Sequence, residues 1–302
     1  MAKSFIKWAG GKHQIINDIH DIIDSMREPY KEFIYVEPFV GGGAVLFSIL
    51  ERCSNLKYAI ITDTNEKLIN CYKVISDDHK YYELKNMLFD IQNRYNKSEN
   101  QNDFYLKIKD IYNSDDEKSD IYEACLFIFL NKTCFNGIYR ENSKGKFNVS
   151  WNKKTYVNLY SEDELDKIHY LLREKVIILS GDYHICSFSM DIARIENCGL
   201  IFYMDPPCRP DKNTIGFVNY TNSDFNDVQQ EQLKLYCDAI DKNGYKFVLS
   251  NYKSDNYFES LYSKYNINVI QTRRNISSNN GSRGKVHELL IHNMEKRNVG
   301  LF

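Results

Sequence analysis

Short apolar runs alternate with helical patterns at both ends of the chain. The apolar runs predict seven β-strands: Phe33 to Val36, Tyr58 to Thr62, Val176 to Ser180, Leu200 to Met204, Lys246 to Ser250, Ile267 to Gln271 and Val286 to His292. Helical spacing predicts helices at Gly43 to Cys53, Asn65 to Ile75, Asp227 to Asp241 and Asp255 to Lys264, the third of which ends at Asn243-Gly244. This alternation is typical of an α/β fold with one open, mostly parallel, Rossmann-like sheet of seven strands covered by helices.

The middle of the chain has a different pattern. Residues 77–160 are rich in Tyr, Asn, Lys and Asp, and their periodicity predicts helices near 79–95, 102–112 and 119–131. A β-hairpin is predicted across Phe135 to Val149, turning at Asn142 to Gly145. We interpret 77–160 as a helical domain that is inserted between the two halves, 1–76 and 161–302, of one α/β domain.

Composition narrows the class of protein. Hydrophobic residues make up 43% of the 302 residues, enough for a sizeable core. The first thirty residues hold no long apolar stretch, so we expect neither a secretory signal nor a membrane span, and a cytoplasmic location. The eight cysteines and seven histidines show no zinc-ligand spacing, which favours free thiols and no bound metal.

The formal net charge of −2 gives no global attraction to nucleic acid. Basic residues are concentrated in two segments, however. Lys132 to Lys154 holds six Lys or Arg against the single acid Glu141, and Arg273 to Lys285 holds four with no acid. Either segment could be an ordinary solvated surface, but the aromatic residues interleaved in the first favour DNA binding.

A glycine-rich turn follows the first predicted strand. The run from Glu37 through Gly41-Gly42-Gly43 leads into a helix, an arrangement that lets a ligand approach the backbone closely. Asp63 stands twenty residues beyond Gly43, where a carboxylate could meet ribose hydroxyls. The turn therefore predicts a nucleoside-containing cofactor. Leu46 replaces the last glycine of the dinucleotide fingerprint, which weakens the case for NAD.

Asp205-Pro206-Pro207 follows the predicted strand Leu200 to Met204. A carboxylate and a peptide carbonyl held by two rigid prolines can both accept hydrogen bonds from one amino group. Such a pair suits chemistry on the exocyclic amine of a base. Cys208 stands next, at a position where a planar ring would be the natural stacking surface for that base.

Six segments together carry a resemblance to a known family. The chain resembles the DNA adenine methyltransferases of the Dam and DpnII type, which use S-adenosylmethionine. The resemblance spans nearly the whole chain and implies a methyltransferase sheet with an inserted target-recognition domain. The segments are KWAGGK at 7–12, EPFVGGGAVLF at 37–47, TDTNEKLINCY at 62–72, NKTCFNGIYRENSKGKFNV at 131–149, SGDY at 180–183 and FYMDPP at 202–207.

The resemblance implies a set of residues around S-adenosylmethionine. Asp63 would take the ribose hydroxyls, and Asp182 would lie beside the adenine ring of the cofactor together with Tyr183. Both acids could instead cap a following helix. The full implied set is Trp8, Lys12, Phe39, Gly41, Gly43, Asp63, Asp182, Tyr183 and Asp205.

The resemblance also implies the chemistry at residues 205–208. The amine of an adenine rotated out of the duplex would donate to Asp205 and to the Pro206 carbonyl, aiming its lone pair at the methyl group. Transfer is then direct, so Cys208 is not expected to act as a nucleophile. Family members carry an aromatic residue after Pro207, and losing its stacking, worth about 1–3 kcal/mol, would slow catalysis roughly ten- to a hundredfold. Phe217 and Tyr220 could compensate.

For DNA recognition, the resemblance implies a hairpin in the major groove of double-stranded DNA. Arg140 would contact one guanine and Lys7 another, with Phe135, Asn136 and Ile138 near the neighbouring bases, most simply in the sequence GATC. Phosphate contacts are expected from the remaining basic residues: Lys144, Lys146, Arg273, Arg274, Arg283 and Lys285. A companion restriction endonuclease that acts separately is left open.

Other functions remain alternatives at this point. Cys208 could mark a member that binds DNA and cofactor but is catalytically weak or inactive. The Asp-Pro-Pro motif also suits methyltransferases that act on RNA or on a protein amide, although the basic hairpin argues against them. An NAD-dependent oxidoreductase is disfavoured by the incomplete glycine pattern.

Overall fold

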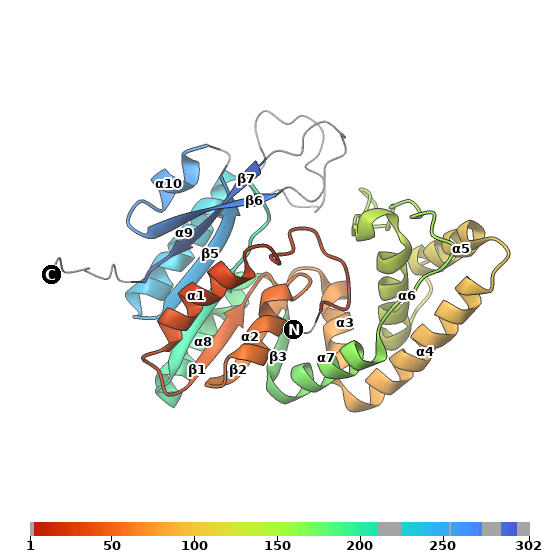
Figure 1. The fold of residues 1–302 in the computed structure, drawn as a ribbon, viewed down its shortest axis with the longest axis horizontal. Helices are drawn as coiled ribbons and strands as arrows, with labels where there is room; N and C mark the ends of the chain where they lie inside the picture. Colours follow the sequence, from red (N-terminus) through yellow and green to blue (C-terminus); the bar gives the residue numbers. More distant parts are fainter. Residues whose placement is uncertain (1–2, 210–224, 254, 274–284, 295–302) are drawn as a thin grey trace.

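A central sheet organises one half of the protein (Figure 1). The computed structural model describes residues 3–209, 225–253, 255–273 and 285–294. In this part of the chain, seven strands form one sheet in the order β3-β2-β1-β4-β5-β7-β6. All seven predicted strands are confirmed, with the bounds β1 (Phe33–Glu37), β2 (Leu56–Asp63), β3 (Val176–Ser180), β4 (Gly199–Met204), β5 (Lys246–Tyr252), β6 (Asn266–Arg273) and β7 (Lys285–His292).

The strand pairings bring several carboxyl ends to one edge. Strands β1 to β5 pair in parallel, and β7 runs antiparallel between β5 and β6. The strands at the centre, β1 and β4, are buried along their whole lengths, as expected when both faces of a parallel sheet are covered. The residues that follow β1, β2, β4 and β5 therefore meet at the same edge.

Alternate strand residues face two separate layers of helices. One face packs against α1 (Ile16–Arg27), α2 (Ala44–Arg52), α3 (Glu66–Ser76) and α7 (Glu162–Lys175). The other face packs against the short helix η2 (Tyr183–Ser187), α8 (Phe188–Glu196), α9 (Asp227–Lys242) and α10 (Tyr257–Leu261). Tyr35 and Tyr203 belong to the first layer, and Ile34 and Phe202 to the second.

The helices differ from the sequence prediction in two respects. Sequence periodicity missed α1, α7 and α8. The predicted helix at Asp255 to Lys264 is wrong in extent, because α10 spans only Tyr257–Leu261 and Tyr262 already leaves helical geometry before the chain enters β6. The predicted end of α9 is confirmed, since Asn243 caps it and Gly244 follows with a left-handed φ of +81°.

Between α3 and α7 the chain leaves the sheet and forms three helices. They are α4 (Asp78–Asn96), α5 (Gln101–Asn113) and α6 (Asp120–Thr133), and all three were predicted. Asp77, Asn100 and Ser119 cap their first turns with side-chain oxygens. Because α6 is buried on nearly every side and packs on α3, the core of the sheet continues into this part of the chain. The domain limits at 77 and 160 stay a prediction.

The predicted hairpin is present in an irregular form. The segment after α6 begins with the short turn η1 (Phe135–Gly137), and antiparallel bridges join Cys134 to Trp151 and Glu141 to Phe147. The N–H of Gly145 donates to the Asn142 carbonyl at 2.9 Å, which closes the predicted tight turn. Pairing is limited to these bridges because η1 interrupts extended geometry, with Asn136 at a φ of +56°.

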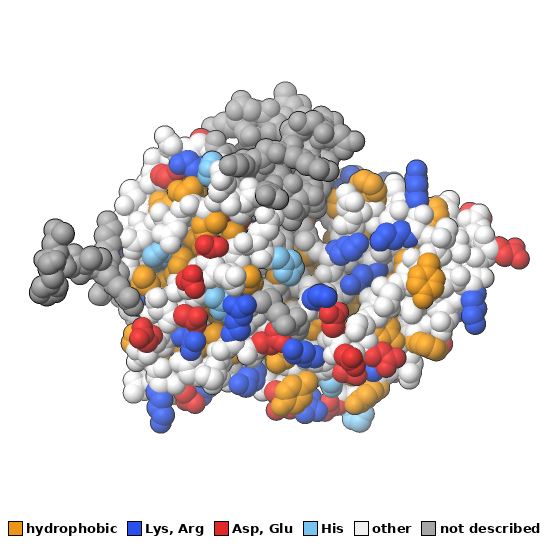
Figure 2. All heavy atoms as spheres, in the orientation of Figure 1, with side chains coloured by type: hydrophobic (Ala, Val, Ile, Leu, Met, Phe, Trp, Pro, Cys, Tyr) orange, Lys and Arg blue, Asp and Glu red, His pale blue; other side chains and the backbone are white. Residues whose placement is uncertain are grey.

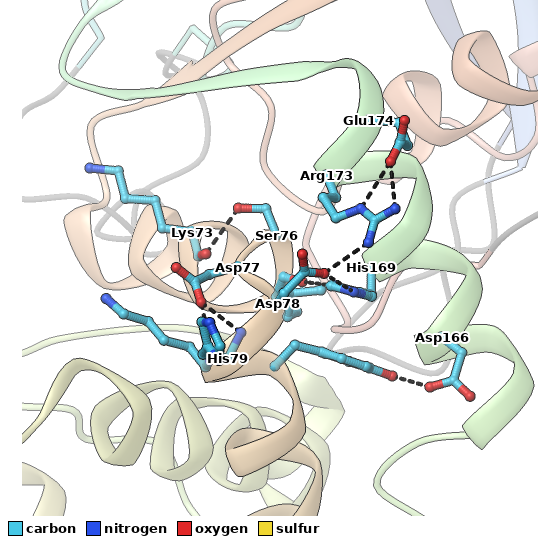
Figure 3. Close-up of polar contacts among 12 residues, drawn as sticks. Lys73, Ser76, Asp77, Asp78, His79, Asp166, His169, Arg173 and Glu174 are labelled. Atoms are coloured by element: carbon cyan, nitrogen blue, oxygen red, sulfur yellow. Dashed lines mark hydrogen bonds and ion pairs between the residues drawn. The ribbon is translucent and has the colours of Figure 1, made fainter.

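A polar cluster joins α7 to the start of α4 (Figure 3). His169 is buried on α7, where its Nδ1 donates to the Ile75 carbonyl at 2.6 Å and its Nε2 lies 3.2 Å from Asp78 Oδ1. Its ring stacks on Tyr81 with a centroid separation of 4.1 Å. Arg173 donates to the same Asp78 oxygen at 3.0 Å, which lowers the Asp78 pKa. The cluster therefore joins the start of α4, where the chain leaves the sheet, to α7, where the chain returns to it.

His169→Ala is expected to lower the free energy of unfolding by about 2 kcal/mol, because it leaves the buried Ile75 carbonyl without this donor and removes a stacked ring. Denaturant unfolding would measure the change. His79→Ala is the control, since His79 is an exposed histidine on α4. Equal effects of the two substitutions would contradict the role given to the cluster.

Candidate active site and nucleic-acid interface

A cleft with a volume of about 2270 Å³ lies at the carboxyl edge of the sheet. The glycine turn after β1, Asp63 after β2 and Asp205 after β4 all line it. So do the N-terminal segment and residues 138–143 beyond α6. One cleft thus brings together residues from five distant parts of the sequence. Figure 2 shows Lys and Arg side chains gathered in the middle of one face, between the sheet-bearing half and helices α4 to α6.

The glycine turn is shaped by close contacts with two aromatic residues. Gly41 and Gly43 adopt left-handed φ values of +47° and +69°. A Cβ at Gly41 would lie 2.7 Å from Trp8 Cδ1, and one at Gly43 would lie 2.6 Å from the Tyr72 hydroxyl. That hydroxyl donates to the Gly41 carbonyl at 2.9 Å. Glycine is therefore required at both positions, and Trp8 lies directly against the turn.

Asp63 connects the glycine turn to the next helix. Its Oδ2 accepts from the Gly41 N–H at 3.1 Å and its Oδ1 accepts from the Asn65 N–H at 2.9 Å. Burial raises the pKa of Asp63, and the N–H donors oppose that rise. The carboxylate thus has a structural role, while each of its oxygens can still accept a further hydrogen bond.

The segment after β3 adds a polar and aromatic wall. Asp182 caps η2 by accepting from the His184 N–H at 2.9 Å, which is the capping role left open by the sequence. The Tyr183 ring lies 5.7 Å from that of Phe39, and Phe225 contacts the other side of Phe39 at 5.9 Å. The sequence-derived cofactor residues Phe39, Asp182 and Tyr183 therefore lie together in the cleft.

Asp205 is held by two contacts to the same oxygen. Its Oδ1 accepts from the Ser250 hydroxyl at 2.9 Å and lies 3.0 Å from the Lys12 ammonium. Lys12 is 5% exposed and also pairs with Glu288 at 2.5 Å. Burial alone would lower the pKa of Lys12, but the neighbouring carboxylates of Asp205 and Glu288 hold it well above its usual range. Lys12, expected at the cofactor, thus contacts Asp205 directly.

Residues 206–209 leave β4 along the cleft wall. Pro206 is buried and Pro207 exposed, and the Pro207 carbonyl accepts from Gln230 at 3.4 Å. Cys208 is accessible to solvent, yet the surrounding walls of the cleft raise its thiol pKa to about 11. Arg209 then anchors the chain by pairing with Asp227 and Asp255 and by lying 3.9 Å above the Tyr257 ring.

Three site residues were missed by sequence reasoning. Ser250 and Tyr252 come from the end of β5, and Glu288 from β7. Two signals could have indicated them: the polar Ser250-Asn251 pair directly after an apolar run, and a single acid inside the apolar run Val286 to His292. Tyr252 lies beneath the Lys12 ammonium, 5.3 Å from the centre of its ring.

Three of the five residues expected to read bases line the same cleft. Lys7, Phe135, Asn136 and Arg140 are exposed, and Ile138 is half-buried. Phe135 is 56% exposed, which is high for a large apolar side chain. Arg140 is steadied by donating from its Nε to Asn148 at 2.7 Å. Lys7, Ile138 and Arg140 line the cleft that also contains Asp205.

The expected phosphate contacts are only partly described. Lys144 is exposed, and Lys146 lies 3.6 Å from Asp115. The backbones of Arg273 and Lys285 belong to β6 and β7. The remaining sequence-derived candidates lie outside the described residues: Arg274, Arg283, Phe217 and Tyr220.

Two general features concern membranes and metals. Among the described residues, none of the helices combines the length and the apolar character that a membrane span needs. Within the same residues, side chains able to ligate a metal converge at His20, Asp24 and Cys53, away from the residues that line the cleft. Asp24 already accepts from Arg27 at 2.6 Å.

Comparisons with known proteins agree with the site. The family model of D12 class N6 adenine-specific DNA methyltransferases matches residues 8–276. Type II methyltransferase M.MjaIII of Methanocaldococcus jannaschii is 37% identical over 298 residues, covering 96% of this chain and 99% of that protein. Type II methyltransferase M1.LlaDCHI of Lactococcus lactis subsp. cremoris is 31% identical over 297 residues, covering 96% and 95%.

Two further similarities are more distant. The DNA adenine methylase of Escherichia coli (strain K12) is 29% identical over 291 residues, covering 95% of this chain and 94% of that protein. The solved rRNA methyltransferase aviRa from Streptomyces viridochromogenes covers 96% of this chain and 89% of its own, with 8% identity and a TM-score of 0.37. That structural likeness is too low to carry an argument.

Lys12→Met is expected to lower the free energy of unfolding by about 3 kcal/mol, because it leaves the buried Glu288 and the half-buried Asp205 without their cation. Adding Glu288→Gln to Lys12→Met should restore part of the loss, and a double-mutant cycle by denaturant unfolding measures this coupling. Lys57→Met, which breaks a more exposed pair with Glu196, should change little. A Lys12→Met protein as stable as the Lys57→Met control would refute the assignment.

Proposed function

The chain belongs to the D12 class of N6 adenine-specific DNA methyltransferases, and from that premise we propose that it transfers a methyl group from S-adenosylmethionine to adenine in double-stranded DNA, within GATC. One observation carries the proposal: Asp205, the glycine turn and the basic residues Lys7 and Arg140 line a single cleft. Membership of this family argues against the two earlier alternatives, an oxidoreductase and a methyltransferase that acts on RNA or protein.

The cofactor end of the cleft fits S-adenosylmethionine. Gly41 and Gly43 line the cleft without side chains, Gly41 lies beside the Trp8 ring, and Asp63 offers acceptor oxygens for ribose hydroxyls at the end of β2. Phe39 and Tyr183 provide an apolar wall for an adenine ring, with Asp182 at its edge. S-adenosylmethionine, when bound, supplies an electrophilic methyl group on a sulfonium.

We assign the role of orienting the target amine to Asp205. Because Lys12 and Ser250 both contact Oδ1, the other carboxylate oxygen, Oδ2, is the one to accept from the adenine amine. The Pro206 carbonyl is the second acceptor. Two acceptors on one amine favour a pyramidal nitrogen and offset the positive charge that develops as the new bond forms. The proton is lost afterwards to water.

The position of Asp205 inside the cleft favours rotation of the target base out of the duplex. Its side chain is 26% exposed, and a base in a stacked helix cannot place its amine against such a group. Lys7 and Arg140, at the outer part of the cleft, are suited to guanine contacts in the flanking base pairs, and GATC supplies guanines on both strands. The type II names of two relatives favour a companion restriction endonuclease that acts separately.

A weak or inactive member is the second candidate function. Cys208 is the observation that favours it, since a thiol cannot stack on a base as a ring does. The cofactor and DNA ends of the cleft would then serve binding alone. The two candidates differ in whether methylated DNA accumulates.

Asp205→Asn is expected to lower the methylation rate by at least a hundredfold, because the amide cannot balance the charge that develops on the amine. The measurement is sequencing of unmethylated DNA treated with protein and S-adenosylmethionine, which reports the modified base and its sequence together. Asp191→Asn, an exposed acid on α8, is the control and should retain the wild-type rate. A methylation rate that Asp205→Asn leaves undiminished would contradict the proposed mechanism. Methylation at sites other than GATC would refute only the recognition sequence.

Cys208→Tyr is expected to raise the methylation rate by about tenfold or more, since it supplies the missing stacking surface, worth about 1–3 kcal/mol. Initial rates on a GATC duplex at saturating cofactor measure this, with Cys208→Ser as the control that adds no ring. A silent wild-type protein rescued by tyrosine would favour the second candidate. An active wild type that tyrosine does not improve would show that stacking at residue 208 is not limiting.

A further inference from the structure

Asn131 joins the N-terminal segment to the turn that follows α6. Its carboxamide is 2% exposed and makes three hydrogen bonds to backbone groups. Its Oδ1 accepts from the Lys7 N–H at 2.8 Å, and its Nδ2 donates to the Lys7 carbonyl at 2.8 Å and to the Gly137 carbonyl at 3.1 Å. Because one partner is a donor and two are acceptors, the orientation of this amide is fixed by its surroundings.

The same junction is closed by packing. Gly137 has a left-handed φ of +65°, and a Cβ there would lie 2.5 Å from both Cβ and Cδ of Lys7. One residue beyond Lys7 and two beyond Gly137, Trp8 stacks on Tyr139 at a centroid separation of 6.1 Å. Lys7 and the 135–140 turn therefore lie against each other without intervening space, in a register that Asn131 holds by hydrogen bonds.

The N-terminal segment continues from this junction to the catalytic end of the cleft. Within five residues of Lys7 the chain passes Trp8, which lies on the glycine turn, and reaches Lys12, which pairs with Asp205. The two elements assigned to base reading are thus fixed to each other at Asn131 and tied to the catalytic acid by the same short segment. A shift at Asn131 would change the spacing of the two base-reading elements, while the hydrogen bonds of Asp63 are made to Gly41 and Asn65 outside this segment.

We infer that Asn131 is a positioning residue for sequence discrimination, which holds Lys7 and the 135–140 turn as one rigid base-reading unit. The inference rests on the proposed function. Asn131 does not line the cleft, so it acts through the residues that it fixes and not by touching DNA. Discrimination between base pairs depends on placing hydrogen-bonding groups within a narrow geometry, and a flexible reader accepts wrong pairs more readily.

The test compares Asn131→Asp with Asn152→Asp in the full chain. Asn131→Asp keeps the shape and the acceptor for the Lys7 N–H, but it replaces both donated hydrogen bonds by repulsion between oxygens. Asn152 is a matched control because its side chain also donates to a backbone carbonyl, that of Lys132 at 3.2 Å, and accepts from a backbone N–H, that of Lys154, but contacts neither Lys7 nor Gly137 by these bonds. The readouts are the range of sequences methylated in unmethylated genomic DNA, the rate ratio between the preferred duplex and single-base variants, and S-adenosylmethionine binding.

We expect Asn131→Asp to broaden the methylated sequences and to lower the rate ratio about tenfold or more, with cofactor binding unchanged and Asn152→Asp like the wild type. Rates that fall equally on all duplexes, with the same ratio, would overturn the inference in favour of a purely structural role. If Asn131→Asp fails to fold, Gly137→Ala is the variant to measure, because its Cβ displaces Lys7 from the other side of the junction. A broader set of methylated sequences would support the inference, and an unchanged rate ratio would overturn it. A wild-type protein that methylates no DNA would overturn the proposed function itself, and the inference with it.

Discussion

The arrangement of the cleft depends on one buried cation. Lys12 is 5% exposed and lies between Asp205 and Glu288, at 3.0 and 2.5 Å. A buried ammonium is costly unless it is paired, and two nearby carboxylates repel each other unless a cation lies between them. One lysine satisfies both requirements when the segment before α1 lies across the edge of the sheet where β4 ends and β7 begins.

The rest of the site follows from the path of that segment. Once Lys12 is fixed, Trp8 lies against the glycine turn and Lys7 reaches α6, where Asn131 binds its backbone. A segment of six residues thus contacts the cofactor end, the acid and the base-reading turn. Three elements that are far apart in the sequence, the glycine turn, Asp205 and the turn after α6, are thus joined through one short segment.

Much of this could be predicted from the sequence, for a definite physical reason. Buried strands such as β1 and β4 appear in the sequence as apolar runs, which is why they could be predicted. Side chains that follow the strands of a parallel sheet meet at one edge, so Asp63 and Asp205 could be predicted together. Ser250, the partner of Asp205, and Glu288, the second partner of Lys12, were not found, because the polar positions in their apolar runs do not indicate which distant residues they contact. The resemblance to Dam and DpnII enzymes is confirmed by the family match. It does not by itself indicate that Lys12 faces the acid.

Cys208 lies in the same region as Asp205 and Lys12. Desolvation in the cleft raises its thiol pKa to about 11, so the thiol is neutral at pH 7. A neutral thiol neither competes with Asp205 for Lys12 nor presents a second nucleophile to a methyl donor, whereas a thiolate would do both. A cysteine at this position therefore adds no competing chemistry. Methyl transfer to an amine remains the reaction that the charges in this cleft favour.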